Sequence, residues 1–252
     1  MMNPFGGKVD RGFYRRIDRR YLFDRLPERF LPKEGLPPVV RNACDAIILI
    51  HSRDILLTAY GTGICLAARS GIEGGAVVVT ALHVVKSTGG TDFIRVGDRN
   101  YIGVEVARDE SCDLVLLESN MPITAPDVEF AKEDELGHGE LYIVGHLYVR
   151  KSRKGKITTY EKRLCAYNIA SSARRQLLPD GKFAISVPSE ILDFFNGFSG
   201  GPLMDSRGVI IGMIQQIRYG RILGIIPLGH SSVEGVHGCK LQHFINSNNG
   251  QV

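Results

Sequence analysis

Cysteines are few in this sequence, and they stand alone. The 252 residues include five cysteines with no C-x-x-C pair among them. They are Cys44, Cys65, Cys112, Cys165 and Cys239. An odd number in this pattern argues against a disulfide framework or a zinc ribbon, so we interpret them as buried thiols.

Long apolar runs are also lacking. Residues 1–16 contain no apolar stretch of signal-peptide length, and no run of about 18 apolar residues occurs anywhere. We therefore expect a cytoplasmic protein with no membrane span.

Most of the chain has no excess of either charge. Beyond residue 41 it holds 21 Lys and Arg against 22 Asp and Glu. A nucleic-acid groove needs clustered basic side chains on the folded domain, so no nucleic-acid partner is expected.

Residues 1–41 differ, with ten basic against five acidic side chains. Phe13, Ile17 and Tyr21, with Leu22 and Leu26 following, recur at four-residue spacing ahead of Pro27, which predicts an amphipathic helix with a basic outer face. Such an arm packs on the domain with that face solvated, docks a protein partner, or contacts lipid or nucleic acid. We assign residues 1–41 as a basic N-terminal arm, helical in part, with residues 36–38 as the linker into the domain.

The domain, residues 42–252, has the pattern of an all-β fold. The 29 glycines of the chain exceed the usual share of about 7% and predict many tight turns. Apolar or alternating segments recur at 46–51, 63–68, 76–81, 101–107, 114–118, 141–144, 156–167, 183–187, 209–216 and 223–227. A break near 121–127 divides them into two β units, roughly 42–122 and 128–235, and residues 240–246 suit a short terminal helix.

One serine stands among glycines, in the segment G-F-S-G-G-P over residues 197–202. A nucleophilic hydroxyl must sit on a tight turn whose backbone N–H groups point at the oxyanion that forms on attack. Glycines permit that close approach. Ser199 is therefore a candidate nucleophile, and the N–H groups of Gly197 and Ser199 are the candidate oxyanion donors.

A serine needs a base, and the base needs an orienting acid. His83 follows the apolar strand at 76–81, and Asp113 precedes the strand at 114–118. Taken alone, each would be an ordinary core histidine or turn carboxylate. Their order and spacing with Ser199 are what support a joint catalytic role.

These three motifs, T-A-x-H, D-L-x-L-L and G-x-S-G-G-P, resemble those of the chymotrypsin/trypsin-type serine peptidases. The pattern is closest to the bacterial HtrA-type protease domain, without a PDZ domain. The resemblance implies a double six-stranded β-barrel with the site between the barrels, and a serine endopeptidase that needs no cofactor. It assigns His83 as general base and acid, Asp113 as its orienting acid and Ser199 as nucleophile.

Two rival interpretations of these residues are weaker. The segment at 197–201 also fits the G-x-S-x-G elbow of α/β-hydrolases, but there the acid and histidine follow the serine. The remaining histidines show no established metal spacing, so no metal site is expected. A third possibility remains open: a catalytically silent protein that keeps the fold as a binding or scaffold module.

The sequence also departs from the secreted branch of the family. Phe198 stands where secreted members usually carry an aspartate that pairs with a newly cut N-terminus, and phenylalanine forms no ion pair. We therefore expect removal of residues 1–35 to leave cleavage of small peptides largely unchanged. No cysteines flank His83 or Ser199, which fits a reducing compartment.

Substrate choice follows least directly from the sequence. By resemblance, Gln215, Gln216 and Ile217 belong to the substrate-binding strand, and Asp193 holds the position of the carboxylate in the primary specificity pocket. A carboxylate there favours cleavage after Arg or Lys. A preference for small aliphatic residues is the alternative, because Ile217 narrows the entrance and Asp193 also suits a solvated turn. A protein or peptide substrate is the expected partner, with a second protein partner at the basic arm.

Overall fold

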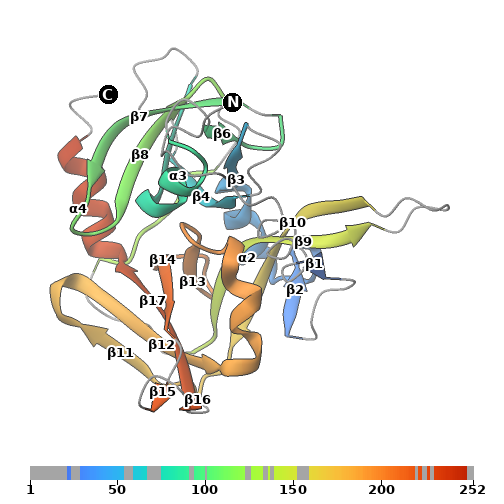
Figure 1. Cartoon of the computed structure of the whole chain (residues 1–252). Helices are drawn as coiled ribbons and strands as arrows, with labels where there is room; N and C mark the ends of the chain where they lie inside the picture. The colour runs from blue at the N-terminus through green and yellow to red at the C-terminus, as the bar shows by residue number, and fades with distance from the viewer. Residues whose placement is uncertain are drawn as a thin grey trace.

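Two β units follow each other along the chain in the computed structural model (Figure 1). The structure describes residues 22–23, 29–53, 59–66, 75–90, 94–99, 101–122, 126–132, 136, 139–151, 159–218, 221–222, 226–227 and 230–248.

The first unit is a closed barrel of six antiparallel strands. They are β3 (Ile47–Ser52), β4 (Tyr60–Leu66), β5 (Ala76–Ala81), β6 (Ile94–Val96), β7 (Tyr101–Asp109) and β8 (Leu114–Ser119). The strands pair in the order β3-β4-β5-β8-β7-β6, and β6 closes the ring on β3. Strand β5 is buried along its whole length. This burial explains its continuous apolar sequence, since a strand covered on both faces needs no polar alternation.

The second unit is a nine-stranded sheet. Its members are β1 (Leu22–Phe23), β2 (Phe30–Pro32), β9 (Leu141–Lys151), β10 (Thr159–Ile169), β11 (Arg175–Leu178), β12 (Lys182–Pro188), β13 (Pro202–Asp205), β14 (Ile210–Arg218) and β17 (His230–His237). Six of them run in the order β12-β17-β14-β13-β9-β10; β11 extends one edge, β2 extends the other, and β1 pairs with β9. No pairing closes β10 onto β12 among the described residues. A separate pair, β15 (Arg221–Ile222) and β16 (Ile226–Pro227), forms a small ribbon.

The helices are short. They are α2 (Pro38–Ala43), α3 (Leu82–Ser87) and α4 (Gly238–Asn248), with 3-10 turns η1 (Lys33–Gly35), η2 (Cys44–Ala46), η4 (Pro179–Gly181) and η5 (Ser189–Gly197). Within the described ranges, none is long and apolar enough to cross a membrane. The predicted all-β architecture with a C-terminal helix is confirmed.

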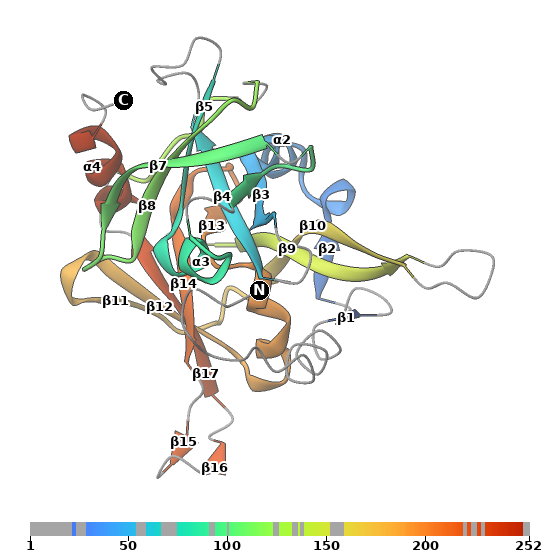
Figure 2. The same ribbon diagram turned by 45° about the horizontal axis from the view of Figure 1, so that its top comes forward.

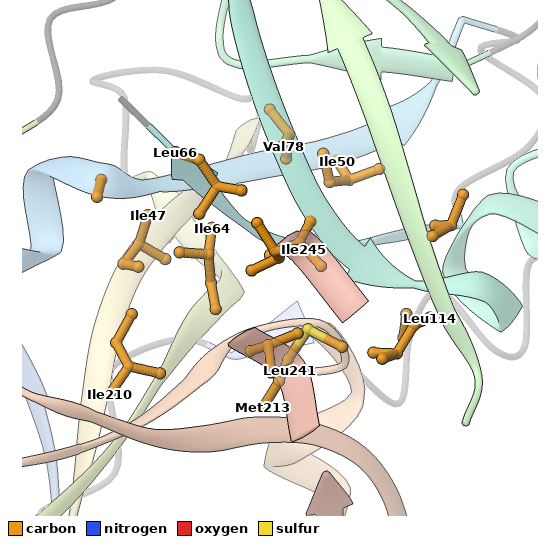
Figure 3. Close-up of a cluster of buried hydrophobic side chains, with 14 of the residues drawn as sticks. Ile47, Ile50, Ile64, Leu66, Val78, Leu114, Ile210, Met213, Leu241 and Ile245 are labelled. Atoms are coloured by element: carbon orange, nitrogen blue, oxygen red, sulfur yellow. The ribbon is translucent and has the colours of Figure 1, made fainter. Parts of the chain in front are cut away.

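The terminal helix α4 joins the cores of the two units. Its apolar face places Leu241 and Ile245 among the barrel side chains Ile64 and Val78, next to Met213 of β14 (Figure 3). Figures 1 and 2 both show α4 lying against the barrel at one end and the second sheet at the other. The apolar residues of the predicted amphipathic helix therefore pack between the two units and connect their cores.

The N-terminal segment is part of the second sheet. Strand β1 pairs in parallel with β9, and β2 pairs antiparallel with β10. Leu22 and Phe23, which the periodicity places in or beside a helix, are extended, because the edge of β9 supplies backbone partners there. Tertiary pairing of this kind overrides a local helical period. The remaining part of the predicted helix, 13–21 and 24–26, lies outside the described residues.

The boundary drawn at residue 42 also shifts. Leu36 and Val40 are buried in the same hydrophobic cluster as the barrel core. Helix α2 begins at Pro38, in the first helical turn where a missing N–H costs nothing. Of the predicted linker, Leu36 is thus packed in the core while Pro37 is half-buried and Pro38 is exposed, and the folded body includes residues ahead of residue 42.

Candidate active site

His83 and Asp113 meet because their strands are neighbours. Strands β5 and β8 pair with Ala81 opposite Leu114, so the residues just after β5 and just before β8 lie side by side. Asp113 Oδ2 lies 2.6 Å from His83 Nδ1, and Asp113 Oδ1 accepts the His83 backbone N–H at 2.8 Å. The carboxylate therefore orients both the ring and its backbone, with Nδ1 as the donor and Nε2 left to act as a base.

The turn that carries Asp113 is held on several sides. Asp113 has a left-handed backbone with φ of 54°, a conformation that costs a non-glycine residue roughly 1–2 kcal/mol. Its carbonyl accepts the N–H of Leu82 at 3.0 Å. Asp109 caps the turn by accepting the N–H groups of Ser111 and Cys112. The Ser111 hydroxyl, which also donates to it, is the main cause that lowers the pKa of Asp109.

Ser199 lies on the second unit, between η5 and β13. We call residues 197–201 the nucleophile turn. Gly200 has φ of 81°, and its N–H donates to Ile214 O at 2.8 Å. A β-carbon on Gly200 would lie 2.1 Å from the Thr62 carbonyl oxygen, so both conformation and space require glycine. The Ser199 carbonyl accepts the N–H of Thr62 at 2.9 Å, which ties the turn to the barrel.

The structure brings Ser199 and His83 to one junction. A β-carbon on Gly61 would lie 3.0 Å from the Ser199 carbonyl oxygen and 2.7 Å from the side chain of Val84, the residue after His83. Ser199 Oγ donates to the carbonyl of Gln215 at 3.5 Å. Among the described residues no hydrogen bond joins Ser199 to His83. All three predicted catalytic residues are thus at the junction, and only His83 and Asp113 are in direct contact.

The two expected oxyanion donors differ in whether their N–H groups are already hydrogen-bonded. Ser199 N–H donates to no backbone carbonyl in the described part of the chain. Gly197 ends η5, and the i→i+3 pattern of that helix directs its N–H back into the last turn. The next N–H, of Phe198, is taken by Phe195 O at 2.9 Å. One donor is therefore available, and the other becomes available only when the Asn196–Gly197 peptide turns.

This arrangement of strands and residues agrees with a known family. Residues 61–213 match the family model described as a trypsin-like peptidase domain. The chain belongs to this family. The resemblance predicted from the three motifs is thereby confirmed.

Three solved protease structures have a similar fold. The active form of Rv3671c protease from M. tuberculosis has a TM-score of 0.54 at 19% identity, covering 91% of this chain and 93% of that one. A serine-to-alanine mutant of Rv3671c from M. tuberculosis H37Rv, in its inactive form, gives 0.53 at 20% identity, covering 84% and 91%. A mutant of the HtrA-type protease AlgW, solved with a tripeptide, gives 0.52 at 18% identity, covering 85% and 64%. No curated protein sequence matches the chain.

The side chain of Gln215, a residue of the predicted substrate-binding strand, contacts the turn that carries Asp113. The pairing of β14 with β17 shifts between Ile214 and Gln216, so Gln215 sits at an irregularity. Its side-chain amide donates to the carbonyl of Cys112 and, at 3.4 Å, to that of Asp113. Gln215 therefore links the Asp113 turn to the strand beside Ser199.

The other predicted pocket residues have different surroundings. Gln216, at an exposed position, donates to Glu234 Oε2 at 2.8 Å. Ile217 is partly buried against the core of the second unit. The backbone of Asp193 lies in η5, and its side chain is outside the described part of the structure. No three His, Cys, Asp or Glu side chains converge on a possible metal position in the described ranges.

Thr62 and His146 form a buried polar contact that the motifs did not reveal. Thr62 Oγ1 donates to the carbonyl of Gly197 at 2.7 Å and accepts the backbone N–H of His146 at 3.1 Å. His146 Nδ1 lies 3.1 Å from the same hydroxyl. The hydroxyl has one proton, already donated to Gly197, so Nδ1 must carry a hydrogen. Burial, helped by the charge of Lys162, lowers the pKa of His146 to about 3, which keeps the ring neutral.

An aromatic cluster lies beneath the nucleophile turn. Its members are Phe30, Tyr167, Phe195 and Phe198, with ring centroids between 5.2 and 5.8 Å apart in five pairs. Phe198 is fully buried there. Sequence spacing gave no signal for this cluster, because Phe30 joins it from the N-terminal segment.

Proposed function

We propose that the protein is a serine endopeptidase with His83, Asp113 and Ser199 as its catalytic residues. The observation that carries the proposal is the His83–Asp113 pair, held at 2.6 Å at the junction where the nucleophile turn meets the barrel. His83 Nε2 takes the Ser199 hydroxyl proton as Oγ attacks the peptide carbonyl. His83 then gives that proton to the leaving amine, and water hydrolyses the resulting ester by the reverse sequence.

Two local adjustments would complete this geometry. Ser199 Oγ must exchange its long contact with Gln215 O for His83 Nε2. The Asn196–Gly197 peptide must turn so that the N–H of Gly197 joins that of Ser199 as an oxyanion donor. Gly197 suits a pivot, because glycine adopts backbone dihedrals that other residues rarely reach. A β-carbon there would lie 2.1 Å from the His146 carbonyl oxygen, so only glycine fits at this position.

The same observations support a second candidate, a silent module that keeps the fold for binding. It is favoured by the helical state of Gly197 and by the missing Ser199–His83 contact. Hydrolysis of a peptide library by the wild-type protein, with Ser199→Ala as control, separates the two. Cleavage that depends on Ser199 supports the peptidase, and no cleavage by the folded wild type supports the silent module.

Substrate preference is proposed as basic residues before the cleaved bond, with small aliphatic residues as the alternative. The support is the position of Asp193 in η5, immediately ahead of the nucleophile turn. Cleavage of a peptide library by the wild type and by Asp193→Ser distinguishes these two preferences. A preference for Arg and Lys that Asp193→Ser removes supports a basic pocket, and a preference for Val, Ala or Leu that this variant leaves unchanged eliminates it.

A reducing compartment such as the cytoplasm is also proposed. All five cysteines are free thiols. Burial raises the pKa of Cys65 to about 11 and that of Cys44 to about 12, so these thiols stay protonated and unreactive. Equal activity with and without a thiol reductant, and no disulfide in protein purified from its native cells, would agree with this assignment. A native disulfide would contradict it.

A further inference from the structure

Phe30 connects the N-terminal segment to the site. It opens β2, where it pairs with Tyr167 of β10 at the edge of the second sheet. Only 3% of its surface is exposed. Figures 1 and 2 show this segment beside β9 and β10, away from the barrel.

The Phe30 ring packs directly on the residue that precedes the nucleophile. Its centroid lies 5.8 Å from that of Phe198 in an edge-on arrangement and 5.6 Å from that of Phe195. Phe195 and Phe198 are themselves 5.2 Å apart. Edge-to-face pairs at these distances are favourable beyond the area they bury.

Phe198 is clamped on its other side by backbone. A β-carbon on Gly145 of β9 would lie 2.5 Å from the Phe198 ring, so the ring rests against the main chain of that strand. The ring thus has β9 on one side and Phe30 with Phe195 on the others. Loss of the Phe30 ring would leave a void beside Phe198 that rigid neighbours fill only in part.

The backbone of Phe198 organises the nucleophile turn. Its N–H donates to Phe195 O at 2.9 Å, and its carbonyl accepts the N–H of Gly201 at 2.8 Å. Phe198 also stands between Gly197 and Ser199, the two expected oxyanion donors. The Phe198–Ser199 peptide carries the Ser199 N–H, and the Gly197 N–H lies one residue ahead of the Gly197–Phe198 peptide. A shift of the Phe198 ring therefore moves the Ser199 donor directly and the Gly197 donor through the neighbouring residue.

We propose that Phe30 is a positioning residue of the active site, which makes the N-terminal segment part of the machinery that holds the oxyanion donors. The inference rests on the proposed peptidase function. It reverses the expectation that residues 1–35 can be removed without effect on small substrates. Truncation after residue 28 keeps β2 and should keep turnover, whereas truncation after residue 35 removes Phe30 and should lose it.

The test is a graded series at position 30, with Phe30→Leu, Phe30→Val and Phe30→Ala. The control is Phe244→Ala, which removes a buried ring from the other hydrophobic cluster. We expect Phe30→Ala to lower kcat about tenfold to a hundredfold with KM unchanged, because small misplacement of catalytic groups has effects of that order. Binding of a peptide aldehyde should weaken by the same factor, Phe30→Leu should stay within about threefold of wild type, and Phe244→Ala should keep kcat at matched loss of melting temperature.

Equal kcat in Phe30→Ala and Phe244→Ala at matched stability would overturn the inference. Where Phe30→Ala does not fold, the Val and Leu variants carry the same comparison. Amide hydrogen exchange at Gly201 measures how firmly the nucleophile turn is held, independently of turnover. Faster exchange in the Phe30 series than in Phe244→Ala supports the inference, and equal exchange contradicts it. A folded wild type that cleaves nothing refutes the proposed function, and the exchange result still decides the role of Phe30.

Discussion

The two halves of the candidate site are built differently. His83 and Asp113 come from neighbouring strands of one closed barrel, and short direct hydrogen bonds lock them together. The nucleophile turn leads into β13, an interior strand of the second sheet, and it depends on backbone contacts, one threonine hydroxyl and ring packing. Strand register positions the first half, whereas the second half requires, in the proposed mechanism, that the Asn196–Gly197 peptide turn out of η5.

Removal of the proposed nucleophile Ser199 or of its base His83 should give the largest loss of turnover. Ser199→Ala and His83→Ala should each lower kcat about 10⁶-fold. Where catalytic residues act as one unit, removing one of them removes nearly all of the rate enhancement that the unit supplies. Peptide hydrolysis under saturating substrate measures it, with circular dichroism as the control for folding. Wild-type turnover by Ser199→Ala would remove this serine from the mechanism.

Asp113→Asn probes the locked half. An amide in place of the carboxylate holds the wrong histidine tautomer, so turnover should fall about 10⁴-fold while the fold is kept. The pH dependence of kcat/KM should also differ between Asp113→Asn and the wild type, because His83 loses its carboxylate partner. An undiminished rate would mean that another carboxylate orients His83.

Thr62→Val probes the adjustable half. The carbonyl of Gly197 loses its hydroxyl donor, so kcat should fall about tenfold to a hundredfold with little change in KM. Thr62→Ser should restore most of it. Thr88→Val is the matched control, since Thr88 is equally buried and donates to Val85 O at 2.9 Å away from the turn. Equal rates for the two valine variants would separate Thr62 from the chemistry.

Gln215→Met tests the link between the halves. The carbonyls of Cys112 and Asp113 lose their side-chain donor, and a hydrogen bond of about 1 kcal/mol corresponds to a change of roughly fivefold to tenfold in kcat. Gln242→Met on α4 provides the control. A change in KM alone would instead support the substrate-binding role expected from the sequence.

The smallest effect concerns stability in acid. The folded-state pKa of His146 is about 3, below the ordinary value near 6.5, so the unfolded chain binds a proton that the folded chain refuses. Stability should therefore fall as pH drops from about 6.5 toward 3, by about 2 kcal/mol at pH 5. The lowered pKa of His51 acts in the same direction.

Urea unfolding at pH 7 and pH 5 measures this change in stability. His146→Gln should flatten the dependence, and His243→Gln, at an exposed position, should leave it intact. A wild-type free energy of unfolding that does not change between these pH values would show that His146 is not held neutral.

The sequence predicted what local pattern controls. Apolar segments marked β5 and β8, and the motifs named the residues that pairing of those strands brings together. Strands β13 and β17 were missed because their segments are rich in polar residues, proline and glycine, although neighbouring strands bury them. Burial of a strand depends on its partners more than on its own composition.

Long-range packing at the site was out of reach. Gln215 turns toward the barrel because pairing of β14 with β17 is irregular beside it, and no sequence pattern marks that position. Phe30 reaches Phe198 through sheet pairing at the far edge of the second unit. Thr62 lies in a G-T-G segment that gives no functional signal in the sequence. The role of its hydroxyl follows from its contact with Gly197, which is distant in the sequence.

The most direct test of the central claim is labelling by a fluorophosphonate probe, with the modified residue identified by peptide mapping. The reagent requires the nucleophile, the base and the oxyanion donors to work together. The account predicts one label per chain on Ser199 of the wild type and none on Ser199→Ala or His83→Ala. A folded wild type that takes no label, or takes it on another residue, would contradict it.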